Sequence, residues 1–433
     1  MNRIAIAITI LTIISPSHVA LSFHRNPVSI QSTDNTISIE LAVGDEMGGA
    51  NIAVADLGND GTDEILVGAG LGSEPRVRVL RQDGSEIGNF LAYAPNMGVG
   101  LNVVACDITG DGFKEIITAP QRGGGPHIRV FDRYGEPLYE GFFAYSESFR
   151  GGVNLACGDL VGDSGAELVT LPAPGGGPHV RIWSWENKME LQEEFFAFNE
   201  KDRAGVIGVV SDKKLFLAQQ HTQTPSLKEI VIHSQVTTID EEELDLDALG
   251  LYDIFVHKGE VYVTTTNGVI YNTKTNVSTF QETASGSVSA ESNGETIYTV
   301  SSRFMFTPST DPKKIIVDIS QQRLYAFEYG VLSNTFLISS GLNGATPLGN
   351  HEVLAKIPEV HYAWSYGPGN PNNYDLGWIP YNLRIYPHIY IHYAPWHNNF
   401  GHTMSHGCIN VALADIMWVY EWAEEGIPVI VQE

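Results

Sequence analysis

Short runs of alternating apolar and polar residues fill most of the first 300 positions of the chain. Examples are Val77-Arg78-Val79-Leu80 and the runs at residues 229–233 and 260–266, and Gly, Asn and Asp residues separate such runs. Alternation with a period of two predicts β-strands with one buried face, whereas a helix needs apolar residues every three or four positions. Helical periodicity is absent from this region, so the pattern predicts a mainly β fold.

The strand pattern recurs as a repeat between about residues 45 and 200. Each of three copies opens with an acidic loop and ends in an aromatic run, at residues 90–93, 142–145 and 195–198, and the copies are offset by 51 and 52 residues. About four short strands in ~50 residues is the size of one β-propeller blade. A solenoid is the competing architecture, but solenoids generally have shorter periods or contain helices.

Strand signals persist after the repeat fades, and they set the predicted domain boundaries. At ~45–50 residues per blade, residues 35–305 would hold a propeller of about six blades, with the later blades degenerate. A separate small β domain at residues 205–305 is the alternative. Residues 306–312 are rich in Pro, Ser and Thr and are predicted to be a linker. Residues 313–433 are then a second, β-rich domain with a helix near its C-terminal end.

The acidic loops place carboxylates at matching positions in the three copies. They are Asp56, Asp60 and Glu64, then Asp107, Asp111 and Glu115, then Asp159, Asp163 and Glu167. These copies resemble the FG-GAP family of propeller repeats, whose Asp-rich loop often binds calcium. The resemblance implies only weak calcium sites here, because the third loop position holds Gly58, Thr109 or Val161 in place of a carboxylate. Alternatively, the acidic side chains only cap turns by accepting hydrogen bonds from backbone amides.

Charge and cysteine content narrow the partners and the compartment. The net charge of −26 argues against nucleic acid as a partner, since phosphate binding needs clustered Lys and Arg. Arg3 precedes an apolar run at residues 4–14, so residues 1–22 are predicted to be a secretion signal, with an uncleaved anchor as the alternative. Cys106 and Cys157 occupy nearly matching places in two copies. They form either a disulfide or, on the simpler interpretation, two small buried side chains.

The strongest chemical signal lies near the C-terminus. His392 is followed, after 12 intervening residues, by Ser405-His406-Gly407-Cys408-Ile409-Asn410. A thiol near histidines can act as a nucleophile, because imidazole accepts its proton and stabilises the thiolate. Gly407 permits an unusual backbone angle and close approach of a substrate. A helix predicted at about residues 412–425 would bring its positive dipole end near the thiolate. A metal cluster that adds His397 and His402 is the alternative, but the spacings fit no common zinc pattern.

This segment resembles the L,D-transpeptidase catalytic domain (YkuD family) over about residues 311–433, in the order and spacing of its motif and in its flanking strands. The resemblance implies that Cys408 is the nucleophile, that His392 is its base and that His406 orients or polarises the site, with no cofactor required. It also implies that the backbone amides of Gly407 and Cys408 stabilise an oxyanion and that Ser405 fixes the loop by hydrogen bonding.

Three further residues are candidates for contact with the substrate: Tyr393, Trp396 and Asn410. Tyr393-Ala394 stands where many relatives have Gly-Thr or Gly-Ser, which would narrow the pocket. Asn410 stands where many relatives carry Arg, so a substrate-carboxylate contact of that Arg does not carry over to this chain. Trp396 would line the cleft or pack into the core.

The resemblance implies an exported enzyme of the bacterial periplasm, cell envelope or cell wall. Cys408 would form a thioester with a peptidoglycan stem tetrapeptide and pass the acyl group to an amine, giving a 3→3 cross-link. The propeller would bind wall polymer or a surface protein. The alternatives are an L,D-carboxypeptidase, an enzyme that anchors proteins to the wall, and a surface-binding propeller with an inactive terminal domain.

Overall fold

The structure, a computed structural model, describes residues 28–432 with short gaps. The gaps are residues 33–37, 42–47, 72, 98, 163, 223, 233–235, 245, 247–249, 266–267, 282–287, 302–312, 321, 329–330, 366 and 372. The predicted secretion signal and linker therefore lie outside the described residues. No helix within the described ranges is long and apolar enough to cross a membrane.

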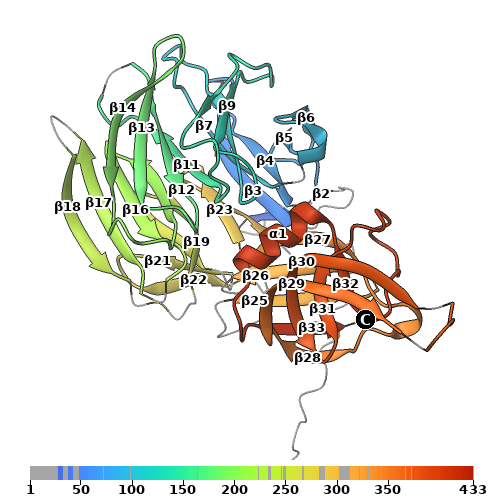
Figure 1. The fold of residues 1–433 in the computed structure, drawn as a ribbon. Helices are drawn as coiled ribbons and strands as arrows, with labels where there is room; N and C mark the ends of the chain where they lie inside the picture. Colours follow the sequence, from blue (N-terminus) through green and yellow to red (C-terminus); the bar gives the residue numbers. More distant parts are fainter. Residues whose placement is uncertain are drawn as a thin grey trace, which may run out of the picture.

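Six four-stranded antiparallel sheets form a ring in a propeller-like arrangement (Figure 1). Three blades coincide with the sequence repeats: β3 (Gly48–Ala55), β4 (Glu64–Leu71), β5 (Arg76–Leu80) and β6 (Glu86–Leu91); β7 (Leu101–Cys106), β8 (Glu115–Pro120), β9 (His127–Phe131) and β10 (Phe142–Phe143); β11 (Val153–Gly158), β12 (Glu167–Pro172), β13 (His179–Trp185) and β14 (Met189–Phe196). A single 3-10 turn, η1 (Pro95–Met97), lies between the first two of them. Each repeat is therefore one blade.

Three more blades complete the ring without a visible repeat in the sequence. They are β15 (Val206–Ser211), β16 (Lys214–Gln219), β17 (Ser226–Ile232) and β18 (Val236–Glu243); β19 (Leu251–His257), β20 (Glu260–Thr265), β21 (Val269–Asn272) and β22 (Val277–Gln281); and β1 (Val28–Ser32) and β2 (Ser38–Leu41) with β23 (Val288–Ser292) and β24 (Ile297–Ser301). The predicted mainly β fold and six blades are confirmed. The alternatives of a solenoid and of a separate domain at residues 205–305 are wrong, because these strands close the same ring.

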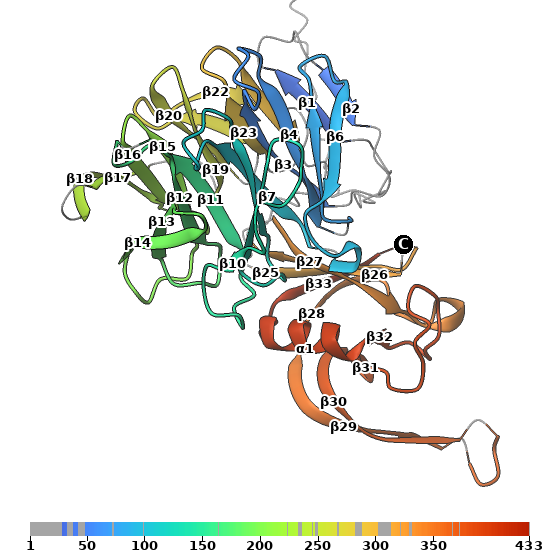
Figure 2. The same cartoon turned by 90° about the horizontal axis from the view of Figure 1, so that it is seen from above.

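Strands from both ends of the propeller region share the sixth blade, as Figure 2 shows. β1 pairs in antiparallel fashion with β24, with Ile30 opposite Val300, and β2 pairs with β1. This closure joins the first and last segments of the ring, so β1 belongs to the propeller although it precedes the predicted start at residue 35.

Repeated polar side chains tie each blade to the next. Asn102 on β7 donates to the carbonyl of Val153 at 2.8 Å, and Asn154 on β11 donates to the carbonyl of Val206 at 2.7 Å. The hydroxyl of Tyr145 donates to carbonyls of the next blade at 2.7 and 2.9 Å, and Tyr93 does the same one blade earlier. Because these buried carbonyls lie on the neighbouring sheet, the bonds fix the blades relative to one another.

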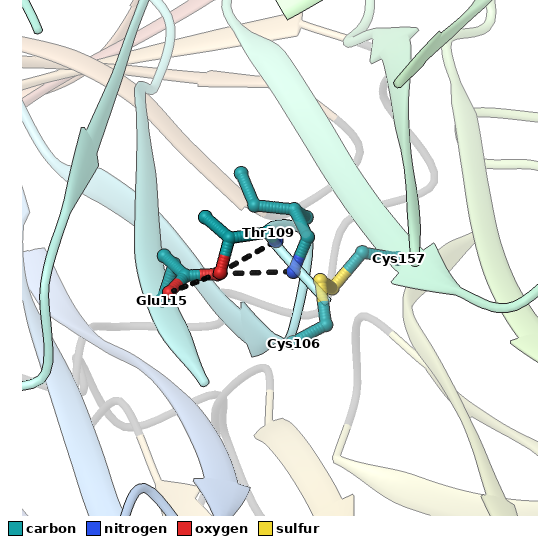
Figure 3. Close-up of a disulfide and its surroundings, with 5 residues drawn as sticks. Cys106, Thr109, Glu115 and Cys157 are labelled. Atoms are coloured by element: carbon teal, nitrogen blue, oxygen red, sulfur yellow. Dashed lines mark hydrogen bonds between the residues drawn. A yellow bond between two sulfur atoms is a disulfide. The ribbon is translucent and has the colours of Figure 1, made fainter. Parts of the chain in front are cut away.

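A disulfide between Cys106 and Cys157 adds a covalent link between neighbouring blades (Figure 3). It joins the ends of β7 and β11, which are the inner strands of the second and third repeat copies. Of the two interpretations open from the sequence, the structure therefore contains the disulfide and not two free buried thiols. Disulfides persist in oxidising compartments, which favours a location outside the cytoplasm.

The second domain is a curled nine-stranded sheet that packs on helix α1 (Leu413–Trp422). In sheet order the strands are β28 (Gly349–Glu352), β33 (Pro428–Gln432), β25 (Lys313–Asp318), β26 (Arg323–Glu328), β27 (Val331–Ser339), β32 (Ile409–Val411), β31 (Ile389–Tyr393), β30 (Tyr374–Tyr386) and β29 (Ala355–Trp364), with a 3-10 turn η2 at Leu342–Gly344. Ile416 and Val419 of α1 are fully buried against the sheet. The long hairpin of β29 and β30 projects away from the rest of the domain (Figure 2).

The two domains meet through a partly buried ion pair. Arg122, just after β8, contacts the carboxylate of Glu328 at the end of β26, and its guanidinium lies 5.7 Å from the ring centre of Trp418 on α1. The indole N–H of Trp422 donates to the same carboxylate at 2.6 Å, and Nδ1 of His221 lies 3.9 Å from it. Loops of two blades thus contact one carboxylate of the second domain.

A cavity of about 390 Å³ lies along the inner strands of the propeller, and both domains contribute to its wall. Its lining includes Arg122 and His221 from the blades and Ser333 from β27 of the second domain. Asp253 and Glu291 also line it, and burial raises their pKa values to about 6 and about 8. The second domain therefore forms part of the wall of this cavity.

Candidate active site

Cys408 lies immediately before β32, which pairs in parallel with β31. In this register His392 is opposite Asn410, and Cys408, two residues earlier, points to the same face of the sheet as both. Cys408 is partly exposed and is the only free thiol, because the other two cysteines are bonded to each other. The sheet thus places one accessible thiol and one buried histidine on a common face.

The turn before Cys408 is held by hydrogen bonds. The hydroxyl of Ser405 donates to the carbonyl of Cys408 and accepts from the amide of Gly407 at 3.1 Å. Thr346 donates to the carbonyl of Gly407 at 2.9 Å, and its hydroxyl accepts from the amide of Gly341 at 2.8 Å. These bonds fix the turn that carries the thiol.

Gly407 is required by the shape of this turn. Its φ of 138° lies in the region that favours glycine. A Cβ there would lie 2.8 Å from Cδ1 of Ile389 and 3.0 Å from the carbonyl oxygen of Ala345. The amide of Gly407 donates to the hydroxyl of Ser405, whereas the amide of Cys408 makes no side-chain hydrogen bond among the described residues.

His392 is 1% exposed, and both of its ring nitrogens have partners. Nδ1 lies 2.6 Å from the carbonyl oxygen of Tyr393, and Nε2 lies 3.0 Å from the amide nitrogen of Asn410. The thiol of Cys408 makes a long contact of 3.8 Å to the carbonyl of His388 and no hydrogen bond to His392. A loose contact between nucleophile and base is common without substrate, so this geometry does not exclude His392 as the base.

Aromatic rings surround the thiol and the histidine. The ring of Tyr362 from β29 stacks on His392 with a centroid distance of 4.4 Å and is within electrostatic reach of Cys408. Trp396 is 39% exposed, and the centre of its ring lies 5.8 Å from the centre of the His392 ring. His406 is exposed, and its ring stacks on that of Tyr374 with a centroid distance of 5.9 Å. The half of the long hairpin nearest its loop, beside the pair Trp364 and Tyr374, therefore forms one wall of the site.

Burial shifts both members of the nucleophile–base pair toward their neutral forms. It raises the pKa of the Cys408 thiol to about 11, although the amide of Tyr390 acts in the opposite direction. It lowers the pKa of His392 to about 4, an effect that the Tyr393 carbonyl opposes and His397 reinforces. At neutral pH the site therefore holds a neutral thiol and a neutral imidazole.

Residues 312–431 match the family model of the L,D-transpeptidase catalytic domain, YkuD. The second domain is a YkuD domain. The chain is also 38% identical over 94 residues to the probable L,D-transpeptidase 3 of Mycobacterium tuberculosis, a match that covers 20% of this chain and 34% of that relative. The chain therefore spans about a third of the length of this curated relative.

Solved structures of related enzymes were also found. An L,D-transpeptidase from Mycobacterium smegmatis is 20% identical, with 42% of this chain and 98% of that chain covered and a TM-score of 0.27. The catalytic domain of the E. faecium L,D-transpeptidase acylated by ertapenem is 24% identical, with 28% and 98% covered and a TM-score of 0.25. Both scores are below 0.5, so the assignment of the YkuD domain rests on the sequence matches.

Two of the predicted substrate-contact residues of the YkuD domain make contacts within the protein instead. The side chain of Tyr393 packs against the hydrophobic core, and its carbonyl contacts His392. Asn410 is 1% exposed, and its amide bonds both His392 and His397. Their geometry favours support of the histidine over contact with substrate, whereas Trp396 lies at the rim of the site as expected for a cleft residue.

Sequence reasoning named Trp364 and Tyr366, the latter outside the described residues, as possible cleft residues but missed two others of the hairpin, Tyr362 and Tyr374. They lie 30 and 18 positions before His392, outside any motif, and only the pairing of β29 with β30 brings them to the site. The usable signal was the density of aromatic residues in that segment.

The acidic loops of the propeller act as turn caps in this structure. Asp56 accepts the amides of Asp60 and Gly61 through its two oxygens, and Asp107 accepts those of Gly110, Asp111 and Gly112. Glu64, Glu115 and Glu167 accept the amides of Leu57, Ile108 and Leu160 at 2.8–3.1 Å, and Asp159 accepts that of Gly162. Figure 3 shows Glu115 in this arrangement beside the disulfide.

In this arrangement backbone amides already occupy these carboxylates, which among the described residues are not gathered around a common point. Burial raises the pKa of Glu115 to about 7, which disfavours its charged form. Within the described ranges no three His, Cys, Asp or Glu side chains gather as a metal site would need, and Asp163 lies outside those ranges. The same holds for the histidines near Cys408, so the zinc-like alternative gains no support. Calcium binding stays a prediction.

Proposed function

We propose that the YkuD domain is a cysteine acyltransferase that acts on peptidoglycan stem tetrapeptides outside the cytoplasm. The observation that carries the proposal is the partly exposed thiol of Cys408, the only free one, which immediately precedes β32 beside β31 in a domain that matches L,D-transpeptidases. The disulfide between blades supports an oxidising compartment, where the cell wall lies.

The proposed reaction has two steps. The sulfur of Cys408 attacks the carbonyl carbon of the third stem residue while its proton passes to His392. The C–S bond forms, the bond to the terminal D-alanine breaks, and His392 returns the proton to the leaving amine. An amine of a second stem then attacks the thioester, which gives a 3→3 cross-link and restores the thiol. The Cys408 amide stabilises the oxyanion in both steps.

The test is intact mass after incubation with ertapenem, the compound that acylates the E. faecium domain. Because Cys408 is the only free thiol, a Cys408→Ala variant removes the proposed site and no other. We expect one adduct on the native protein and none on the variant. A folded native protein that stays unmodified would contradict the proposal.

Product masses with stem tetrapeptides identify the acceptor. A cross-linked dimer supports the transpeptidase, a tripeptide indicates hydrolysis by an L,D-carboxypeptidase, and a peptide attached to protein indicates an anchoring enzyme. The missing hydrogen bond between Cys408 and His392 favours one further candidate, a surface-binding propeller with an inactive terminal domain. Turnover of any of these substrates would rule that candidate out.

The propeller is proposed to hold the enzyme at wall polymer or at a surface protein. It is docked against the YkuD domain through Arg122 and Glu328, so a bound partner would keep the active site at a fixed distance. Co-sedimentation of the full Cys408→Ala chain with purified wall sacculi measures this binding without turnover. No retention by sacculi and no capture of a surface protein would contradict the role.

A further inference from the structure

Four hydrogen bonds form a chain that runs through His397, Asn410 and His392. The amide of Asn399 donates to Nδ1 of His397 at 3.3 Å, and Nε2 of His397 lies 3.2 Å from Oδ1 of Asn410. Nδ2 of Asn410 lies 3.0 Å from Nε2 of His392, whose Nδ1 lies 2.6 Å from the carbonyl oxygen of Tyr393. The chain starts at a backbone amide and ends at a backbone carbonyl.

These two backbone groups fix the direction of every bond between them. A backbone amide can only donate, so Nδ1 of His397 is the acceptor and Nε2 of this ring carries a proton. A backbone carbonyl can only accept, so Nδ1 of His392 carries a proton. Nε2 of His397 then donates to Asn410, and Asn410 donates to Nε2 of His392. The amide orientation of Asn410 follows from this network.

We propose that His397 is a positioning residue that acts through Asn410 to hold His392 as the Nδ1–H tautomer, which leaves Nε2 to receive the proton of Cys408. The role of Cys408 and His392 rests on the proposed function. In the step, the S–H bond breaks and an Nε2–H bond forms on His392, while the N–H of Asn410 withdraws from Nε2. His397 and Asn410 keep their own protons.

Loss of the donor on His397 would release the amide of Asn410. The amide could then turn and present its oxygen to Nε2 of His392, which favours a proton on Nε2 and competes with the Tyr393 carbonyl that holds the proton on Nδ1. In the Nε2–H tautomer no lone pair remains there for the thiol. Asn410 and His392 are each 1% exposed, so water does not replace the missing donor.

A matched set of variants separates the hydrogen bond from packing. His397→Leu removes the donor at similar volume, whereas His397→Gln places an amide nitrogen where Nε2 of the histidine lies and so keeps it. His402→Leu is the control, because His402 is an exposed histidine of the same loop. All are compared as full-length chains with equal thermal unfolding midpoints.

Two measurements on each variant need neither a wall peptide nor a β-lactam. Long-range ¹H–¹⁵N spectra of ¹⁵N-histidine-labelled protein report which nitrogen of His392 carries the proton. The rate of Cys408 alkylation by iodoacetamide at pH 7.5 reports how readily the thiol loses its proton. We expect His397→Leu to populate the Nε2–H tautomer of His392 and to slow alkylation about tenfold or more. His397→Gln and His402→Leu should match the native protein in both.

An unchanged His392 tautomer in His397→Leu would overturn the proposal, and so would a changed tautomer with an unchanged alkylation rate. The proposal would also be overturned if His397→Gln failed to keep the native His392 tautomer and the native alkylation rate, because the hydrogen-bond donor at position 397 would then not be the relevant feature. A protein that shows the expected shifts but does not react with ertapenem would contradict the proposed function alone.

Discussion

The contact between the propeller and the YkuD domain gives a sharp test of how the two are coupled. Glu328 is 8% exposed and accepts both the Arg122 guanidinium and the indole N–H of Trp422. Glu328→Gln keeps an oxygen for Trp422 but removes the charge. Arg122→Met removes the opposite charge and keeps an apolar stem near Trp418.

The expected magnitude follows from the burial of the pair. Loss of one partner costs about 3–5 kcal/mol for a fully buried pair and less than about 1 kcal/mol for an exposed one. The side chains of Arg122 and Glu328 are 23% and 10% exposed, so the pair lies between these limits. We expect each single variant to lose about 2 kcal/mol of unfolding free energy, and a coupling energy of about 1–3 kcal/mol between the two.

Urea unfolding followed by tryptophan fluorescence is the assay, because Trp418 and Trp422 lie at the contact. The two single variants and the double variant form a double-mutant cycle. Arg76→Met is the control, since Arg76 pairs with Glu74 at a surface where both are well exposed, and it should change stability by less than about 0.5 kcal/mol. Additive effects within about 0.5 kcal/mol would refute the coupling.

Three further predictions concern the blades and the thiol. Replacement of Cys106 and Cys157 by serine opens a covalent loop of 51 residues and should lower the unfolding free energy by about 4 kcal/mol. The urea midpoint should fall, and dithiothreitol should no longer change it. Equal midpoints for the variant and the native protein would contradict this. Tyr145→Phe should lower the unfolding free energy by about 1–2 kcal/mol, because buried carbonyls lose their hydrogen-bond donor. The control Tyr134→Phe, at an exposed tyrosine, should not change the urea midpoint measurably. The Cys408 thiol has a pKa of about 11, so its alkylation rate should still rise steeply above pH 9; a plateau below pH 8 would disprove the shift.

The blades illustrate how far local pattern determines the fold. Residues 45–200 predicted three blades because alternation, turn residues and a period of 51 and 52 residues agreed in each copy. The closure of the ring by β1 was not predicted, since its pairing with β24 joins Ile30 to Val300, and no local signal records so distant a contact. The disulfide was left open for the same reason, because sequence gives the positions of two cysteines but not their distance.

The site shows a similar division. The segment from His392 to Cys408 was found from its spacing, because a parallel strand pair brings its two ends to one face. The contacts that determine how the histidine works were not found. Tyr362 reaches it across a hairpin, and His397 reaches it through Asn410, so each depends on the folded sheet. Asn410 was a candidate for substrate contact because it stands where many relatives carry Arg, but in the structure its amide is engaged by two histidines.

The opposite pKa shifts of Cys408 and His392 bear on how the thiol is activated. Enzymes that keep a thiolate at rest place a positive charge beside the sulfur, and here burial raises the pKa of the thiol to about 11 while it lowers that of His392 to about 4. Both shifts disfavour a thiolate–imidazolium pair at rest and favour proton transfer that accompanies formation of the C–S bond. Oxidation of cysteine proceeds from the thiolate, so a neutral thiol is also protected in the oxidising compartment that the Cys106–Cys157 disulfide indicates. Burial thus keeps the thiol protonated at rest, which lowers its reactivity and protects it from oxidation until an acyl donor binds in the cleft.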